Sequence, residues 1–60
     1  MAVVFIEEVA VAANKTNAQV QTYWKESKDQ AKREGLQVGS DRYWHRVHLL
    51  TKQKAGLDVS

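Results

Sequence analysis

The sequence predicts a small all-α domain of three helices, and three observations support this fold class. Two segments, at about 17–34 and 41–55, repeat apolar residues at helical spacings and follow residues that cap helices. A third segment, at about 3–13, is rich in alanine and other apolar residues. The 60 residues include no proline and no cysteine and suffice for one domain, so we assign residues 1–60 to a single domain.

Segment 17–34 carries start and stop signals at both ends. Thr16 suits the N-cap position, and Gln19 three residues later completes a capping box. Lys32 and Arg33 oppose the negative helix end, and Gly35 can adopt the left-handed conformation that ends a helix. Apolar or small residues recur four, three and four positions apart, at Val20, Trp24, Ser27 and Ala31.

Segment 41–55 has the same organisation. Ser40 suits the N-cap, Asp41 places an acid in the first turn, and Gly56 marks the end. Residues 36–39 are a short link, so the two helices are expected to be neighbours, and residues 57–60 are expected to form a frayed tail. An apolar stripe repeats at spacings of four, three and four and is widened by two neighbours, with the methylenes of the last lysine lying along it. The repeat consists of Tyr43, Val47, Leu50 and Lys54, and the two neighbours are Trp44 and Thr51.

The N-terminal segment fits two structures. As a helix, residues 2, 6, 9, 10 and 13 share an apolar face, and the alanines favour this interpretation. As a strand, the segment has the β-branched and aromatic character that strands prefer. Because a lone strand has no partner within this chain, the alternative is an N-terminal strand with two helices in an obligate dimer. The helix is the preferred prediction.

Size and composition narrow the functional classes. A chain this short buries only about 60% of its unfolded surface, so a protein partner or self-association is expected. The longest apolar run, residues 2–6, is far shorter than the roughly 20 residues that cross a bilayer, so we expect a cytoplasmic protein without membrane contact. Without a cysteine nucleophile, a glycine-rich phosphate loop or room for a pocket, we expect no enzyme activity, cofactor or small-molecule substrate.

One acidic residue and two histidines form a weak candidate metal site. Asp41, His45 and His48 are spaced i, i+4 and i+7, which puts them on one face of segment 41–55. Imidazole and carboxylate groups are ordinary zinc ligands. Three ligands on one helix without a fourth would make an open site, so the preferred interpretation is a solvated polar face without a metal.

The net charge of +2 is unevenly distributed. Residues 1–14 hold two acids and no base, whereas residues 15–54 hold nine bases and four acids, a net charge of +5. Cations on one helix face can neutralise phosphates. The sequence therefore supports, as its second hypothesis, a small dimeric nucleic-acid-binding protein. The candidate phosphate contacts are Lys25, Lys28, Lys32, Arg42 and Arg46.

The aromatic residues favour a different function. Two tryptophans and two tyrosines are more apolar surface than two short helices can enclose, so part of this set is expected to face the N-terminal segment or another chain. The leading hypothesis is therefore a non-enzymatic protein–protein interaction or structural accessory module of a larger assembly. The candidate partner surface consists of Phe5, Ile6, Val9, Trp24, Trp44 and Leu49.

Two resemblances to known families accompany these hypotheses. The stretches 23–25 and 31–35, followed by 39–44 and 52–57, resemble small helical proteins of tailed phages. This resemblance implies a packing pattern and a viral setting, in the host cytoplasm or the virion, but no chemistry. The order of segments, with Ser40 and Asp41 opening the last helix, also resembles ribbon-helix-helix repressors, although Glu7 and Glu8 would repel phosphate where those proteins read DNA.

Overall fold

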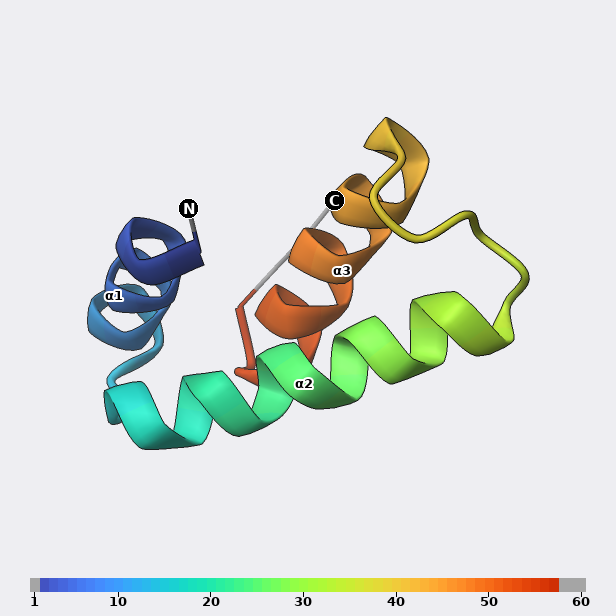
Figure 1. The fold of residues 1–60 in the computed structure, drawn as a ribbon. Helices are drawn as coiled ribbons and strands as arrows, with labels where there is room; N and C mark the ends of the chain where they lie inside the picture. The colour runs from blue at the N-terminus through green and yellow to red at the C-terminus, as the bar shows by residue number, and fades with distance from the viewer. Residues whose placement is uncertain (1, 58–60) are drawn as a thin grey trace.

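The computed structural model describes residues 2–57 and shows three helices. They are α1 (Ala2–Ala13), α2 (Asn17–Arg33) and α3 (Asp41–Lys54) (Figure 1). The described part of the chain contains no strand, so the all-α prediction is confirmed. The alternative with an N-terminal strand is not supported, because the segment is helical and finds its apolar partners within its own chain.

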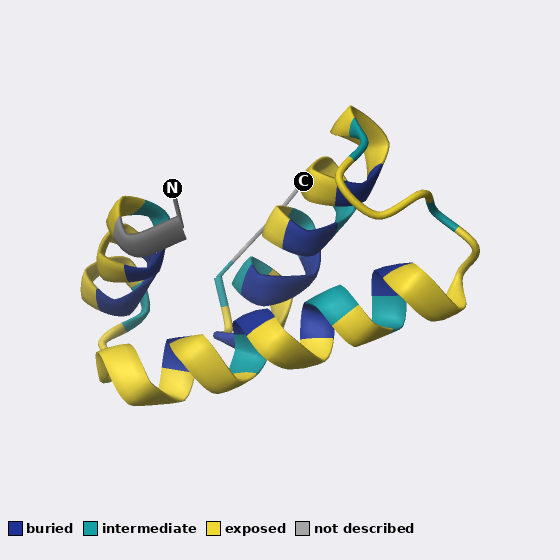
Figure 2. Ribbon diagram, in the orientation of Figure 1, coloured by how far each residue is buried: buried dark blue, intermediate teal, exposed yellow. Residues whose placement is uncertain are grey.

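Helix α2 is the base on which the other two helices pack. In Figure 1, α1 stands over its first half and α3 descends onto its middle, both on the same side. Helix α2 packs extensively against α3 and less against α1, whereas α1 and α3 have little direct backbone proximity. The buried residues of each helix face this common interior, and the exposed residues face outwards (Figure 2).

The predicted N-caps form as expected. Thr16 Oγ1 accepts a hydrogen bond from the backbone N–H of Gln19 at 3.1 Å, and Gln19 Oε1 accepts one from the N–H of Thr16 at 3.0 Å. At the start of α3, Ser40 Oγ accepts from the N–H of Tyr43 at 3.2 Å. These bonds satisfy backbone donors that a helix start otherwise leaves without a partner.

All three helices end in the same left-handed turn. After α2, Gly35 has a φ of 88° and its N–H donates to the carbonyl of Lys32, while the next N–H donates back to the carbonyl of Ala31. The same pair of bonds follows α3 at Gly56, whose φ is 90°. After α1 the position is held by Asn14, whose φ is 55°. This is the Schellman geometry, which satisfies the last carbonyls and reverses the chain.

Small residues let α2 and α3 approach closely. Ser27 and Thr51 are fully buried, with Ala31 and Val47 buried beside them. Thr51 Oγ1 donates to the carbonyl of Val47 at 2.7 Å and lies 3.1 Å from Ser27 Oγ, within hydrogen-bonding distance. Both hydroxyls are therefore satisfied inside an otherwise apolar interface, which avoids the cost of an unpaired buried polar group.

Helix α1 docks through apolar side chains. Ile6, Val9 and Ala10 are buried and belong to the same core as Val20 and Trp24 of α2. The residues that follow α3 also close this core. Leu57, which was expected to begin a frayed tail, is half-buried against it and donates its N–H to the carbonyl of Lys52. The rest of that predicted tail, residues 58–60, lies outside the described residues.

Candidate functional site

Aromatic rings from all three helices meet between α1 and α3. Trp24 rises from α2, and its ring centroid lies 5.4 Å from that of Phe5 on α1 and 5.8 Å from that of Trp44 on α3. His48 of α3 stacks on Phe5 with a centroid distance of 4.2 Å and an interplanar angle of 20°. We call Phe5, Trp24, Trp44 and His48 the aromatic cluster. It joins α1 to α3 through side chains, although their backbones have little contact.

The surroundings of His48 favour its neutral form. His48 is exposed overall, but its partial burial lowers its pKa below the ordinary value of 6.5, and the charges of Lys52 and His45 lower it further. Lys52 Nζ also lies 5.9 Å from the centroid of the Phe5 ring, at the outer limit of a cation–π contact. At neutral pH the cluster therefore holds an uncharged imidazole that stacks on Phe5 and is tilted against Trp24, with the positive charge of Lys52 near the Phe5 ring.

The side of α1 that faces away from α2 is both apolar and acidic. Val4 and Val11 are 62% and 83% exposed, and Glu7 and Glu8 between them are exposed as well. Residues 4, 8 and 11 are spaced i, i+4 and i+7, so they form one stripe along the helix. We call Val4, Glu7, Glu8 and Val11 the α1 outer face; in Figure 2 it belongs to the exposed side of α1.

The structure divides the predicted partner surface between core and surface. Ile6, Val9 and Trp24 are buried, so these side chains hold the fold together and present little area to a partner. Phe5 and Leu49 are half-buried. Trp44 remains 38% exposed, with one face stacked on Trp24. The cause is α1, which folds onto α2 and covers apolar surface that two helices alone would leave open.

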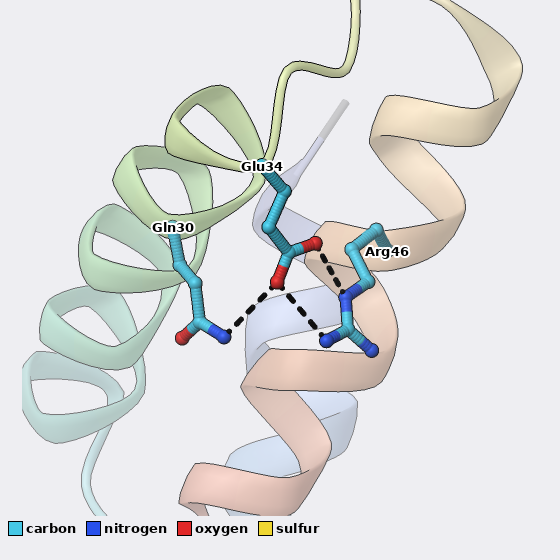
Figure 3. A network of polar contacts seen from close by, with 3 residues as sticks. All are labelled: Gln30, Glu34 and Arg46. Atoms are coloured by element: carbon cyan, nitrogen blue, oxygen red, sulfur yellow. Dashed lines mark hydrogen bonds and ion pairs between the residues drawn. The ribbon is translucent and has the colours of Figure 1, made fainter.

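Four of the five candidate phosphate-binding side chains form no ion pair with another residue in the described range 2–57. Lys25 and Lys32 are exposed and Lys28 is half-buried, all on one flank of α2, while Arg42 is exposed on α3. Arg46 differs, because its guanidinium donates to both carboxylate oxygens of Glu34, at 2.9 and 3.1 Å (Figure 3).

The pair between Glu34 and Arg46 ties the end of α2 to α3. Gln30 donates a further hydrogen bond to Glu34 at 3.3 Å, as Figure 3 shows. The hydrogen bonds from Arg46 and Gln30 lower the pKa of Glu34, and Glu34 raises the pKa of Arg46. The bidentate geometry therefore gives Arg46 a role in holding the two helices, which competes with a role in binding phosphate.

The candidate metal ligands do not converge. Residues 2–57 contain no group of three or more histidine and acidic side chains placed to hold an ion. Asp41 and His48 are seven residues apart on one helix, which separates them by about 10 Å along its axis. His48 is instead engaged by Phe5 and Trp24.

A charged hollow lies between α2 and the end of α3. Its volume is about 300 Å³, and it is lined by Glu26, Asp29, Gln30, Arg33 and Lys54. Four of these five residues are exposed, so the hollow is a surface feature. Two acids and two bases line it, and this mixture has no net preference for an anion or a cation.

Sequence reasoning missed two features of the surface. Val4 and Val11 were not assigned to a partner surface. Their separation of seven residues places them on one face of the helix, and this second apolar face was a signal in the sequence. Glu34 carried no local signal for its pairing with Arg46, twelve residues away. No helix in the described part of the chain has the length and apolar character needed to cross a membrane.

Comparison of the chain with protein-family models, with curated proteins and with solved structures finds no match. A function must therefore be proposed from the surfaces of the molecule itself.

Proposed function

We propose that this protein is a non-enzymatic interaction module that binds a protein partner through the α1 outer face. The observation that carries this proposal is the exposure of Val4 and Val11 on a helix whose opposite face already fills the core. A surface helix that only supports a fold needs one apolar face, and α1 has apolar side chains on both. The second apolar face is therefore available for a contact outside the domain.

The charges on this face define the kind of partner. Glu7 and Glu8 lie between the two valines, and no basic residue belongs to α1. A partner surface that is apolar at its centre and basic at its edge complements this arrangement. Such a small module acts as a structural or accessory component of a larger assembly, and the resemblance to helical phage proteins makes a viral assembly one such setting.

The test compares one disruptive variant with one matched control. Wild-type protein, Val4→Lys/Val11→Lys and Thr22→Lys are immobilised, and proteins captured from the source cells are purified and titrated back individually. Thr22 is exposed on α2, outside the α1 outer face. The proposal predicts a partner that binds wild type and Thr22→Lys and loses at least tenfold in affinity for the double variant. A partner bound equally by all three proteins would contradict it.

A second function is supported by the lysines of α2. Lys25, Lys28 and Lys32 recur at i, i+3 and i+7 without an ion pair in the described residues, which suits a row of phosphate contacts. The test is binding to random duplex DNA as a function of salt. This function predicts binding that weakens steeply with salt and is lost in Lys25→Ala/Lys28→Ala/Lys32→Ala. No detectable binding of wild type at low salt would exclude it.

A further inference from the structure

The apolar stripes of α1 and α2 are in phase with one another. Counting from Ile6, buried or small positions alternate at spacings of four and three through both helices, and α1 and α2 contain no glycine or proline between residues 2 and 33. Asn17 is the exposed polar residue in this pattern, whereas Ser27 is polar but small and buried. Alternating four and three is the repeat of a continuous helix that buries one seam. The positions are Ile6, Ala10, Ala13, Asn17, Val20, Trp24, Ser27 and Ala31.

The turn between α1 and α2 has a more strained backbone conformation than the turns that follow α2 and α3. All three helices end in a left-handed turn, but Gly35 and Gly56 serve this position after α2 and α3, whereas Asn14 serves it after α1. A residue with a side chain is strained in the left-handed region, and asparagine tolerates it better than most residues do. Residues 14–16 alone connect α1 to α2, so this strain sits in a three-residue hinge.

The contacts that hold α1 are not specific to its own chain. Within residues 2–57, no side-chain hydrogen bond or ion pair joins α1 to the rest of the domain, and its docking depends on buried Ile6, Val9 and Ala10 and on the stack of Phe5 with His48. A second copy offers the same sites to an incoming α1. Short, strained hinges favour this kind of exchange.

We propose that α1 exchanges between two copies of this chain, with residues 14–16 becoming helical so that α1 and α2 form one continuous helix. Each copy then receives the partner's α1 on its α2 and α3 at the site its own α1 occupies in the monomer. The tether gives α1 a millimolar effective concentration at its own site, so the monomer predominates in dilute solution and the exchanged dimer forms as concentration rises. The exchange is separate from the α1 outer face, which stays exposed in both forms.

Two substitutions at one position test the exchange in opposite directions. Asn14→Ala favours the continuous helix and Asn14→Gly favours the turn, because glycine adopts the left-handed conformation without strain and alanine does not. Each dimer contains two hinges, so a preference of about tenfold per hinge lowers the dimer dissociation constant of Asn14→Ala about 100-fold relative to Asn14→Gly. Sedimentation across a concentration series measures the dimer dissociation constants. The value for wild type is expected to lie between those of Asn14→Ala and Asn14→Gly.

A distance within one copy separates exchange from any other dimer. Glu7→Cys and Arg33→Cys are exposed positions in a chain without cysteine, so they accept spin labels directly. In a continuous helix their backbones lie about 39 Å apart, whereas the monomer measures 31 Å along its longest axis. Asn14→Ala protein with both labels is diluted into unlabelled protein, so that the distance measured is between the two labels of one copy. This distance is expected to be the longer one. Dimers that keep the short distance would overturn the proposal.

The remaining outcomes also decide the question. Equal dissociation constants for Asn14→Ala and Asn14→Gly would refute the exchange. Should Asn14→Ala lose its helical circular dichroism, the comparison of wild type with Asn14→Gly decides in the same way. Val4→Lys/Val11→Lys in the Asn14→Ala background is expected to dimerise normally, because the exchange buries the inner face of α1 only. A dimer that dissociates in this variant would assign self-association to the α1 outer face, and the exchange would be wrong while the proposed function stood.

Discussion

Single residues in the aromatic cluster decide how α1 is held against the rest of the molecule. Trp24 contacts Phe5 on one helix and both His48 and Trp44 on another, so one side chain links all three helices. Aromatic pairs at these separations contribute about 0.5–1.5 kcal/mol beyond the burial of their area.

Replacing Trp24 is expected to cost far more than replacing Trp44. Trp24 is 8% exposed, so Trp24→Ala removes a buried indole at a cost of about 3–5 kcal/mol. That range is comparable with the whole stability of a 60-residue domain, about 3–9 kcal/mol, and thermal unfolding is expected to lose its cooperativity. Trp44→Ala, at 38% exposure, is the control and is expected to lose about 1–2 kcal/mol. Equal losses in urea unfolding would contradict the central position of Trp24.

The stability of the domain is expected to fall as the pH is lowered from 7.5 to below about 6.5. Because the pKa of His48 is lowered below 6.5 in the folded protein, the unfolded chain takes up a proton first as the pH falls. The stabilisation is fully present above about pH 6.5 and is lost as the pH falls through the lowered pKa. The melting temperature of His48→Gln is expected to change less over this interval than that of wild type. A pKa of 6.5 or above for His48 by NMR would contradict this.

At the scale of the helices, the ends were more predictable than the packing. The capping box at Thr16, the N-cap at Ser40 and the turn at Gly35 depend on residues within a few positions of one another, so the sequence displays them directly. Spacing also identified which face of α2 is buried. It cannot specify which neighbour covers that face, because helices with the same stripe can pack at several angles.

The features that escaped prediction all join distant parts of the chain. The stack of Phe5 on His48 and the pairing of Glu34 with Arg46 depend on how α1 and α3 sit on α2. The same packing moved Ile6 and Val9 from a predicted partner surface into the core and left Val4 outside. The residue types along one helix therefore predicted which of its faces are apolar. Which apolar face remains exposed as a candidate functional surface depended on how the other helices pack against it.

The turn after α2 offers a clean test of the helix ends. Gly35 has a φ of 88°, and an added Cβ would meet no atom within 4 Å, so the cost of Gly35→Ala comes from backbone conformation alone. We expect a loss of about 1 kcal/mol in the free energy of unfolding, and a smaller loss for Gly35→Asn. Urea unfolding measures both variants. An unchanged stability in Gly35→Ala would show that the left-handed turn does not form.

At the scale of the whole molecule, a chain of 60 residues uses three helices to cover one interior and has apolar surface left over. The inner face of α1 closes the core around Trp24, and its outer face presents Val4 and Val11 beside two carboxylates. Both proposals depend on this double use of α1. The outer face suits a basic, apolar partner, and the inner face suits a second copy once the hinge opens.

The central claim is that α1 is a helix docked on its own chain in the monomer, and NMR on dilute, isotope-labelled protein tests it most directly. At a concentration where the protein sediments as a monomer, residues 2–13 are expected to show helical Cα shifts. Nuclear Overhauser effects are expected between the Phe5 ring and the rings of His48 and Trp24, whose centroids lie 4.2 and 5.4 Å away. Extended or unstructured shifts for residues 2–13 in the monomer, with no contact from Phe5 to either ring, would contradict the account.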